Sequence, residues 1–203
     1  MSVDCRRVVI CVAFAVVLLV PRFADAQVTN ETLGLVAGLN SSTLVGPVAA
    51  TMGRLAGGVF GASATGSLTG PVGFEIDALF SQKGVTSFGS RASDELRINY
   101  LDVPVLLRIS TAGEVRAYGL VGPTISFKLG STETYNGAAV TTWKDSDIKG
   151  TDLGFTAGIG LAFGRFDAAV RGTWGLASID ASTSPADIKN MSFTALIGFR
   201  FMK

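Results

Sequence analysis

The chain contains no histidine, and its two cysteines, Cys5 and Cys11, lie near the N-terminus. Histidine is the side chain that most often moves protons near neutral pH, and zinc sites and disulfides are built from histidine and cysteine. Both cysteines fall in a segment that we expect to be removed after export. The mature chain is therefore expected to have no disulfide, no zinc site and no cysteine nucleophile.

Charged residues are scarce: they make up 16% of the 203 residues, and the formal net charge is +1. A chain without a basic patch lacks the electrostatic footprint of nucleic-acid binding, so we expect no nucleic-acid partner. Hydrophobic residues make up 48% and the mean hydropathy is +0.44, which is too high for an ordinary soluble domain. This composition indicates a membrane protein, built either from a spanning helix or from a lipid-facing barrel.

The N-terminal segment has the features of a secretory signal. Two arginines precede an apolar stretch at 8–20, and the triplet Ala24-Asp25-Ala26 follows it. A basic start, a short apolar stretch and a small-residue cleavage site are typical of a cleaved signal peptide, with Gln27 as the first mature residue. An uncleaved anchor would need about 20 apolar residues. We expect a signal peptide at 1–26 and one domain at 27–203.

The mature chain has no run of 18 apolar residues, which argues against a spanning helix, and instead shows alternation with a period of two. In the last segment, the apolar face consists of Met191, Phe193, Ala195, Ile197, Phe199 and Phe201. Such alternation is typical of a strand with one apolar and one polar face. Eight segments are expected to form strands, the first three less clearly patterned: 32–41, 53–63, 72–81, 100–110, 114–128, 152–163, 166–176 and 190–201.

The connections between these segments alternate in length. Short turns are expected at 64–71, 110–113 and 164–165, whereas longer polar loops are expected at 42–51, 82–95, 129–150 and 178–189. Outer-membrane barrels have short periplasmic turns and longer extracellular loops. The pattern predicts an all-β fold, an eight-stranded antiparallel up-and-down transmembrane β-barrel with both termini on the periplasmic side.

Charged residues fall on the polar face of the predicted strands. If the apolar face meets lipid, the interior collects six basic and six acidic residues: Arg54, Arg108, Arg116, Lys128, Arg171 and Arg200, with Glu75, Asp77, Asp102, Glu114, Asp152 and Asp167. An eight-stranded barrel is only wide enough for its own side chains, so these charges should pair with one another. We therefore expect an interior ion-pair network and a largely plugged lumen.

Aromatic residues are expected to form two interfacial girdles on the barrel. The turn-end girdle comprises Phe74, Phe163, Phe166, Phe199 and Phe201, and the loop-end girdle comprises Phe80, Tyr100, Phe127, Phe155 and Trp174.

Five segments resemble, in order and spacing, the PorT-like outer-membrane β-barrel family: 75–84, 100–108, Gly122-Pro123, 157–163 and 174–179. The resemblance covers nearly all of the mature chain. It implies an integral barrel of the bacterial outer membrane, and the family's secretion-associated namesake implies that members can serve translocation machinery. One departure is at the C-terminus: many such barrels end on an aromatic residue, whereas Met202 and Lys203 follow Phe201 here.

Catalytic groups are few. A general base would have to be a carboxylate or a lysine, and the pairs Asp102 with Arg108 and Glu75 with Asp77 are equally explained as interior ion pairs. Glycine-rich stretches do not complete a phosphate-binding motif. We expect no enzyme activity, no cofactor and no metal site. Loop 129–150, which carries Tyr135 and Trp143, is the best candidate for contact with an envelope partner.

Three functions remain open. The first is a monomeric structural or accessory barrel, surrounded by outer-membrane lipid and without catalysis. The second is a narrow porin-like channel for small solutes, which has the same fold with a hydrated lumen. The third is a soluble lipocalin-like periplasmic carrier, which requires the apolar faces to point inward.

Overall fold

The computed structural model describes residues 29–46, 53–86, 95–135, 138–140, 148–181 and 187–201. The expected signal peptide and Trp143 lie outside these ranges. The regular elements within them are all β-strands. A search of the same ranges finds no helix with the length and hydropathy needed to cross a bilayer.

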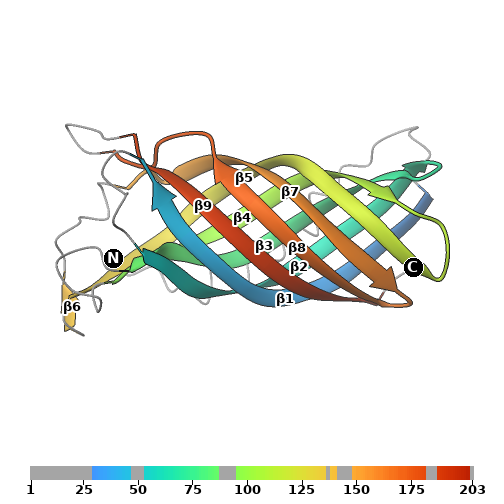
Figure 1. Ribbon diagram of the computed structural model, residues 1–203, viewed down its shortest axis with the longest axis horizontal. Coiled ribbons are helices and arrows are strands. Elements are labelled where there is room, and N and C mark those ends of the chain that lie inside the picture. The colour runs from blue at the N-terminus through green and yellow to red at the C-terminus, as the bar shows by residue number, and fades with distance from the viewer. Residues whose placement is uncertain are drawn as a thin grey trace.

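Eight long strands form one closed antiparallel barrel, and they cross its long axis obliquely (Figure 1). Consecutive barrel strands pair with each other, including β4 with β5 and β5 with β7, and the pairing of β1 with β9 closes the ring. A short ninth strand, β6, pairs only with the end of β5. The predicted fold class is confirmed. The strands are β1 (Thr29–Val45), β2 (Gly53–Thr69), β3 (Val72–Thr86), β4 (Glu95–Ser110), β5 (Val115–Tyr135), β6 (Ala138–Val140), β7 (Thr151–Phe163), β8 (Phe166–Gly175) and β9 (Lys189–Arg200).

Tight turns join the strands at one end of the barrel. The turns after β2 and β7 contain Gly70 and Gly164, with φ of 53° and 54°. Only glycine adopts this left-handed conformation without a steric cost, which explains its presence at both turns. Four connections are shorter than the sequence predicted, because β1, β2, β3 and β5 continue to Val45, Thr69, Thr86 and Tyr135. The end of β5 lies well inside the expected loop 129–150.

The apolar faces of the strands point outward. On β9, Phe193 is 47% and Ile197 is 69% exposed, whereas Ser192 and Leu196 are buried. The same outward alternation places Leu153, Ile159 and Leu161 of β7 on the outer wall. This orientation suits a lipid environment, and it contradicts the soluble-carrier alternative, which requires these faces to point inward.

Candidate functional site

The turn-side half of the interior holds a network of four buried charges. Glu75 and Asp77 lie two residues apart on β3, so both point into the lumen. Arg108 of β4 and Arg171 of β8 each donate to the Glu75 carboxylate, and Arg171 Nη1 donates to Asp77 Oδ2 over 2.5 Å. Two cations therefore face two anions, all of them buried, as a buried ionic network requires.

Tyr118 of β5 holds Arg108 in place. The Arg108 Cζ lies 3.5 Å from the centroid of the Tyr118 ring, a cation–π contact. The ring in turn lies against Gly160 of β7, where an added Cβ would approach Tyr118 Cζ to 2.3 Å. A glycine is therefore required at this position for the ring to lie under the guanidinium.

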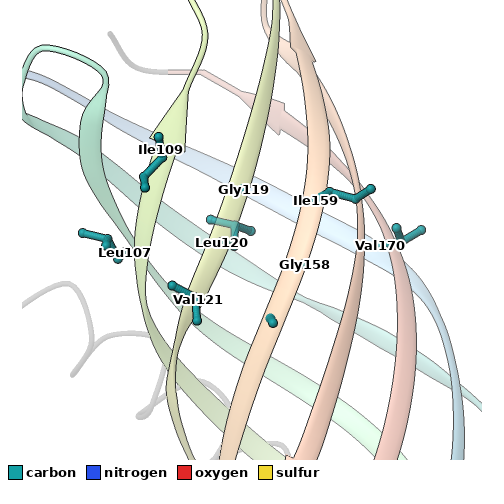
Figure 2. Close-up of a pocket in the computed structure, with 9 residues that line it drawn as sticks. Leu107, Ile109, Gly119, Leu120, Val121, Gly158, Ile159 and Val170 are labelled. Carbon is teal, nitrogen blue, oxygen red and sulfur yellow. The ribbon is translucent and has the colours of Figure 1, made fainter.

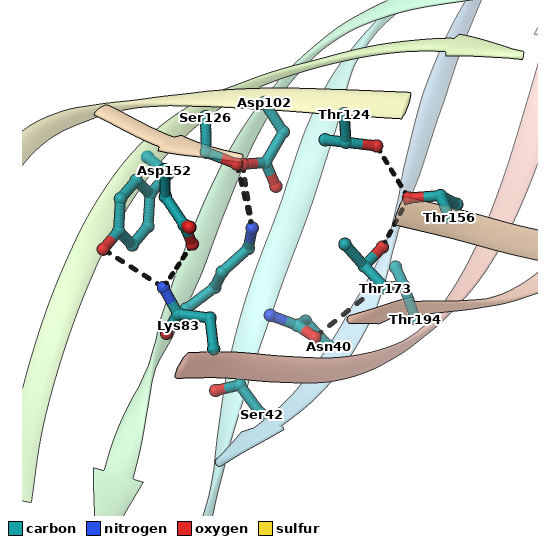
Figure 3. A network of polar contacts seen from close by, with 12 residues as sticks. Asn40, Ser42, Lys83, Asp102, Thr124, Ser126, Asp152, Thr156, Thr173 and Thr194 are labelled. Carbon is teal, nitrogen blue, oxygen red and sulfur yellow. Dashed lines mark hydrogen bonds and ion pairs between the residues drawn. The ribbon is translucent and has the colours of Figure 1, made fainter. Parts of the chain in front are cut away.

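A second polar layer lies in the middle of the barrel and is built around Lys83 (Figure 3). Lys83 Nζ donates to Asp102 Oδ1 over 2.9 Å and lies 3.4 Å from Ser126 Oγ. It also lies 5.1 Å from the centroid of the Tyr100 ring. Lys83 was not among the predicted interior residues, although it is buried and forms an ion pair.

Further hydrogen bonds extend this middle layer. Asn190 Nδ2 donates to Asp152 Oδ2 over 2.8 Å and to Tyr100 Oη over 3.3 Å. The hydroxyls of Thr124, Thr156 and Thr173, from β5, β7 and β8, form a chain with distances of 2.7 and 2.8 Å (Figure 3). An interior hollow bordered by these threonines has a volume of about 20 Å³, which is room for about one water molecule.

An apolar cluster, called here the loop-end cap, closes the opposite half of the interior. Its residues are buried, and they come from the loop-side ends of β1, β3 and β4 and from the connections flanking β7, β8 and β9: Leu44, Val85, Leu96, Ile98, Tyr100, Ile148, Ile179 and Ile188. The connecting segments pair with one another, since Lys149 N donates to Ile179 O and Ile179 N donates to Ile188 O, both over 2.8 Å. The described loop segments thus fold inward over the lumen.

The structure corrects three of the predicted interior charges. Arg54 is exposed on the outer wall, because it shares the outward face of β2 with Phe60, whereas Leu55 and Val59 point inward. Glu114 lies in the turn before β5, and Arg116 lies at the rim of the barrel, and both are exposed to solvent.

Lys128, Arg200 and Asp167 were also predicted to lie in the interior, and each forms a contact outside the two layers described above. Lys128 Nζ donates to the backbone oxygen of Ile148. Arg200 Nε lies 3.7 Å from Asp167 Oδ2 near the turn end. The candidate catalytic pair of Asp102 and Arg108 is not formed, since each is bonded to a different partner.

One predicted girdle residue is also corrected. Tyr100 is fully buried, because it shares the inward face of β4 with Ile98 and Asp102. Phe74 and Phe80 are half-buried. The other seven are exposed on the outer wall: Phe127, Phe155, Phe163, Phe166, Trp174, Phe199 and Phe201.

A shallow apolar hollow of about 420 Å³ indents the outer wall over β4, β5, β7 and β8 (Figure 2). It forms where Gly119 lacks a side chain between two rows of larger residues, including Ile109 and Ile159. Its lining is apolar, which suits contact with lipid more than binding of a polar solute. Within the described ranges, no group of three or more acidic, histidine or cysteine side chains is arranged to hold a metal.

Solved structures of similar fold are small outer-membrane proteins. Neisserial surface protein A is 11% identical, with a TM-score of 0.50, and the match covers 85% of this chain and 99% of that one. The attachment invasion locus protein Ail of Yersinia pestis is 14% identical, with a TM-score of 0.49 and the same coverage. The outer membrane enzyme PagL is 12% identical, with a TM-score of 0.47, and the match covers 84% of this chain and 99% of that one.

No curated protein matches the sequence significantly. A family model described as the outer membrane protein beta-barrel domain matches residues 26–181, which is most of the chain. The closed barrel, its outward apolar faces and this match agree in placing the protein in the bacterial outer membrane. The chain belongs to the outer membrane protein beta-barrel domain family.

Proposed function

We propose that the protein is a non-conducting structural or accessory barrel, anchored by its lipid-facing wall and rigidified by its interior. The observation that carries this proposal is the filling of the lumen: a charged layer around Glu75, a polar layer around Lys83 and the loop-end cap follow one another along the axis. Ions or solutes passing through the lumen would have to break buried ion pairs, and breaking such pairs costs several kcal/mol.

The same interior supports a role without catalysis. Glu75 accepts hydrogen bonds from two arginines and Asp102 accepts one from Lys83, so neither is a free general base. The carboxylates are also buried, away from any substrate in the membrane or in water. PagL, a neighbour of similar fold, is described as an enzyme, so an activity assay belongs with the structural tests.

Two finer roles belong to the proposal. The PorT-like motifs, such as 75–84 and 100–108, support an accessory role associated with secretion. Loop 129–150 would present the surface for an envelope partner, with the barrel itself monomeric. Pull-down of envelope proteins by the full chain and by a variant with shortened residues 136–147 tests this role, and equal capture by both would contradict it.

A narrow channel is the second candidate, favoured by the chain of threonine hydroxyls and the hollow beside it. Single-channel recording in planar bilayers distinguishes the plugged barrel from the narrow channel. We expect no stepwise conductance from the folded wild-type protein and none from Arg171→Ala, because the loop-end cap remains in place. A wild-type conductance that Arg171→Ala alters would show that ions reach the interior, and would replace the plugged barrel by the channel.

A further inference from the structure

Arg54 is an arginine on the outer wall that has no acidic partner among the described residues. It lies one residue from the start of β2, at the loop end, and its side chain is exposed. Two other basic residues lie on the same wall near this end, and each has its own carboxylate: Arg97 pairs with Glu95 over 3.0 Å and Lys189 pairs with Asp187 over 3.4 Å. Among the described residues, no carboxylate pairs with Arg54.

The Arg54 guanidinium is nonetheless held in a defined position. Its Nε donates to Ser41 Oγ over 2.9 Å, and its Nη2 donates to the Ser41 backbone oxygen over 2.6 Å. Its Cζ lies 5.2 Å from the centroid of the Phe193 ring, which packs edge-on against Trp174 with centroids 6.3 Å apart. A guanidinium has five N–H donors, so the two bonds to Ser41 leave three N–H groups that can bind another acceptor.

The surroundings identify the chemistry of a ligand. Below Arg54, toward the turn end, the wall exposes Leu39, Phe60 and Ile197, which are 74%, 54% and 69% exposed. A molecule that satisfies both regions has an anionic head at the level of Arg54 and hydrocarbon chains along this wall. Arginine binds phosphate through paired hydrogen bonds, and aromatic side chains such as Trp174 lie at the headgroup level.

We propose that Arg54, oriented by Ser41 and Phe193, binds the phosphate of an outer-leaflet lipid headgroup. The loop end of an outer-membrane barrel faces the cell exterior, so the site lies at the level of the outer leaflet. An anion there offsets the cost of an unpaired arginine beside lipid. The hydrocarbon chains of the same lipid lie along the wall formed by Leu39, Phe60 and Ile197.

The test is titration of the folded protein, in a zwitterionic detergent, with lipid A and with enzymatically dephosphorylated lipid A, followed by native mass spectrometry. We expect Arg54→Gln to weaken lipid A binding by about fivefold or more, since it removes a charge-assisted contact. The control Arg97→Gln should change binding by less than about twofold, because Arg97 is already paired with Glu95. Dephosphorylated lipid A should bind the wild type as weakly as lipid A binds Arg54→Gln.

A second variant and a competitor complete the design. Arg54→Lys keeps the charge but loses the planar fork, so it should bind with intermediate affinity. The dephosphorylated lipid tests the proposal on the wild-type protein, whatever the folding of the variants. Equal binding by wild type and folded Arg54→Gln, equal loss in Arg97→Gln, or equal binding of the dephosphorylated lipid would each overturn the proposal. If inorganic phosphate at an equal concentration displaced lipid A completely, the bound phosphate would come from free phosphate and not from a lipid, and this part of the proposal would be wrong.

Discussion

Glu75 is the residue on which the buried charges at the turn side depend, because Arg108 and Arg171 both donate to it. Glu75→Gln leaves Arg171 paired with Asp77 and removes the carboxylate to which the buried Arg108 donates. We expect the free energy of unfolding to fall by about 3–5 kcal/mol, the usual cost of breaking a buried pair. Urea unfolding in lipid vesicles, followed by tryptophan fluorescence, measures it.

Glu114→Gln is the matched control, since Glu114 is an exposed carboxylate in the turn before β5. It should change the free energy of unfolding by less than about 0.5 kcal/mol. Equal losses in the two variants would mean that overall charge, and not the buried network, sets the stability.

The close contact between Gly160 and the Tyr118 ring leads to a second prediction at the residue scale. Gly160→Ala brings a methyl group against the buried Tyr118 ring and disturbs its contact with Arg108. Overpacking of this kind costs about 1–3 kcal/mol. Gly119→Ala is the control, because an added Cβ there meets no atom within 4 Å. A thermal unfolding series on both variants checks the prediction, and a stable Gly160→Ala protein would contradict it.

At the scale of single elements, the end of β3 explains why Lys83 was missed. Lys83, Gly84 and Val85 are buried in succession, and Gly84 has a φ of +147°. Lys83 still follows the inward alternation of Asp77 and Ser81. The sequence prediction ended the strand at residue 81, because the polar run Ser-Gln-Lys-Gly at 81–84 is typical of a turn. By contrast, Tyr100 could have been placed from the sequence, since it is two residues from Asp102 and shares its face.

The loop-end cap allows a prediction about the connection after β8. Ile179→Ala removes a buried side chain from the cap, and we expect a loss of about 2–4 kcal/mol in the free energy of unfolding. Leu176→Ala, in the same connection, is the control, because Leu176 is 62% exposed. Chemical denaturation of both variants measures the two losses in the free energy of unfolding. An Ile179→Ala loss no larger than that of the control would mean that the cap does not contribute to stability.

At the scale of the whole molecule, every barrel strand is hydrogen-bonded on both sides, so unfolding has no free edge at which to begin. We expect the membrane-extracted protein to migrate faster on a detergent gel unboiled than boiled. A compact barrel that survives the detergent explains the difference. The same mobility with and without boiling would contradict a closed barrel.

The sequence by itself determined the fold class, the outward faces of most strands and the outer-membrane location. The reason is that a period of two is a local property, readable without knowing any partner strand. Only the tertiary structure decided which interior charges meet, because Arg171 and Asp77 are 94 residues apart and their contact depends on closure of the barrel. It also decided the face of Arg54, because the small residues of β2 give the sequence alternation there too little contrast to show which face meets lipid.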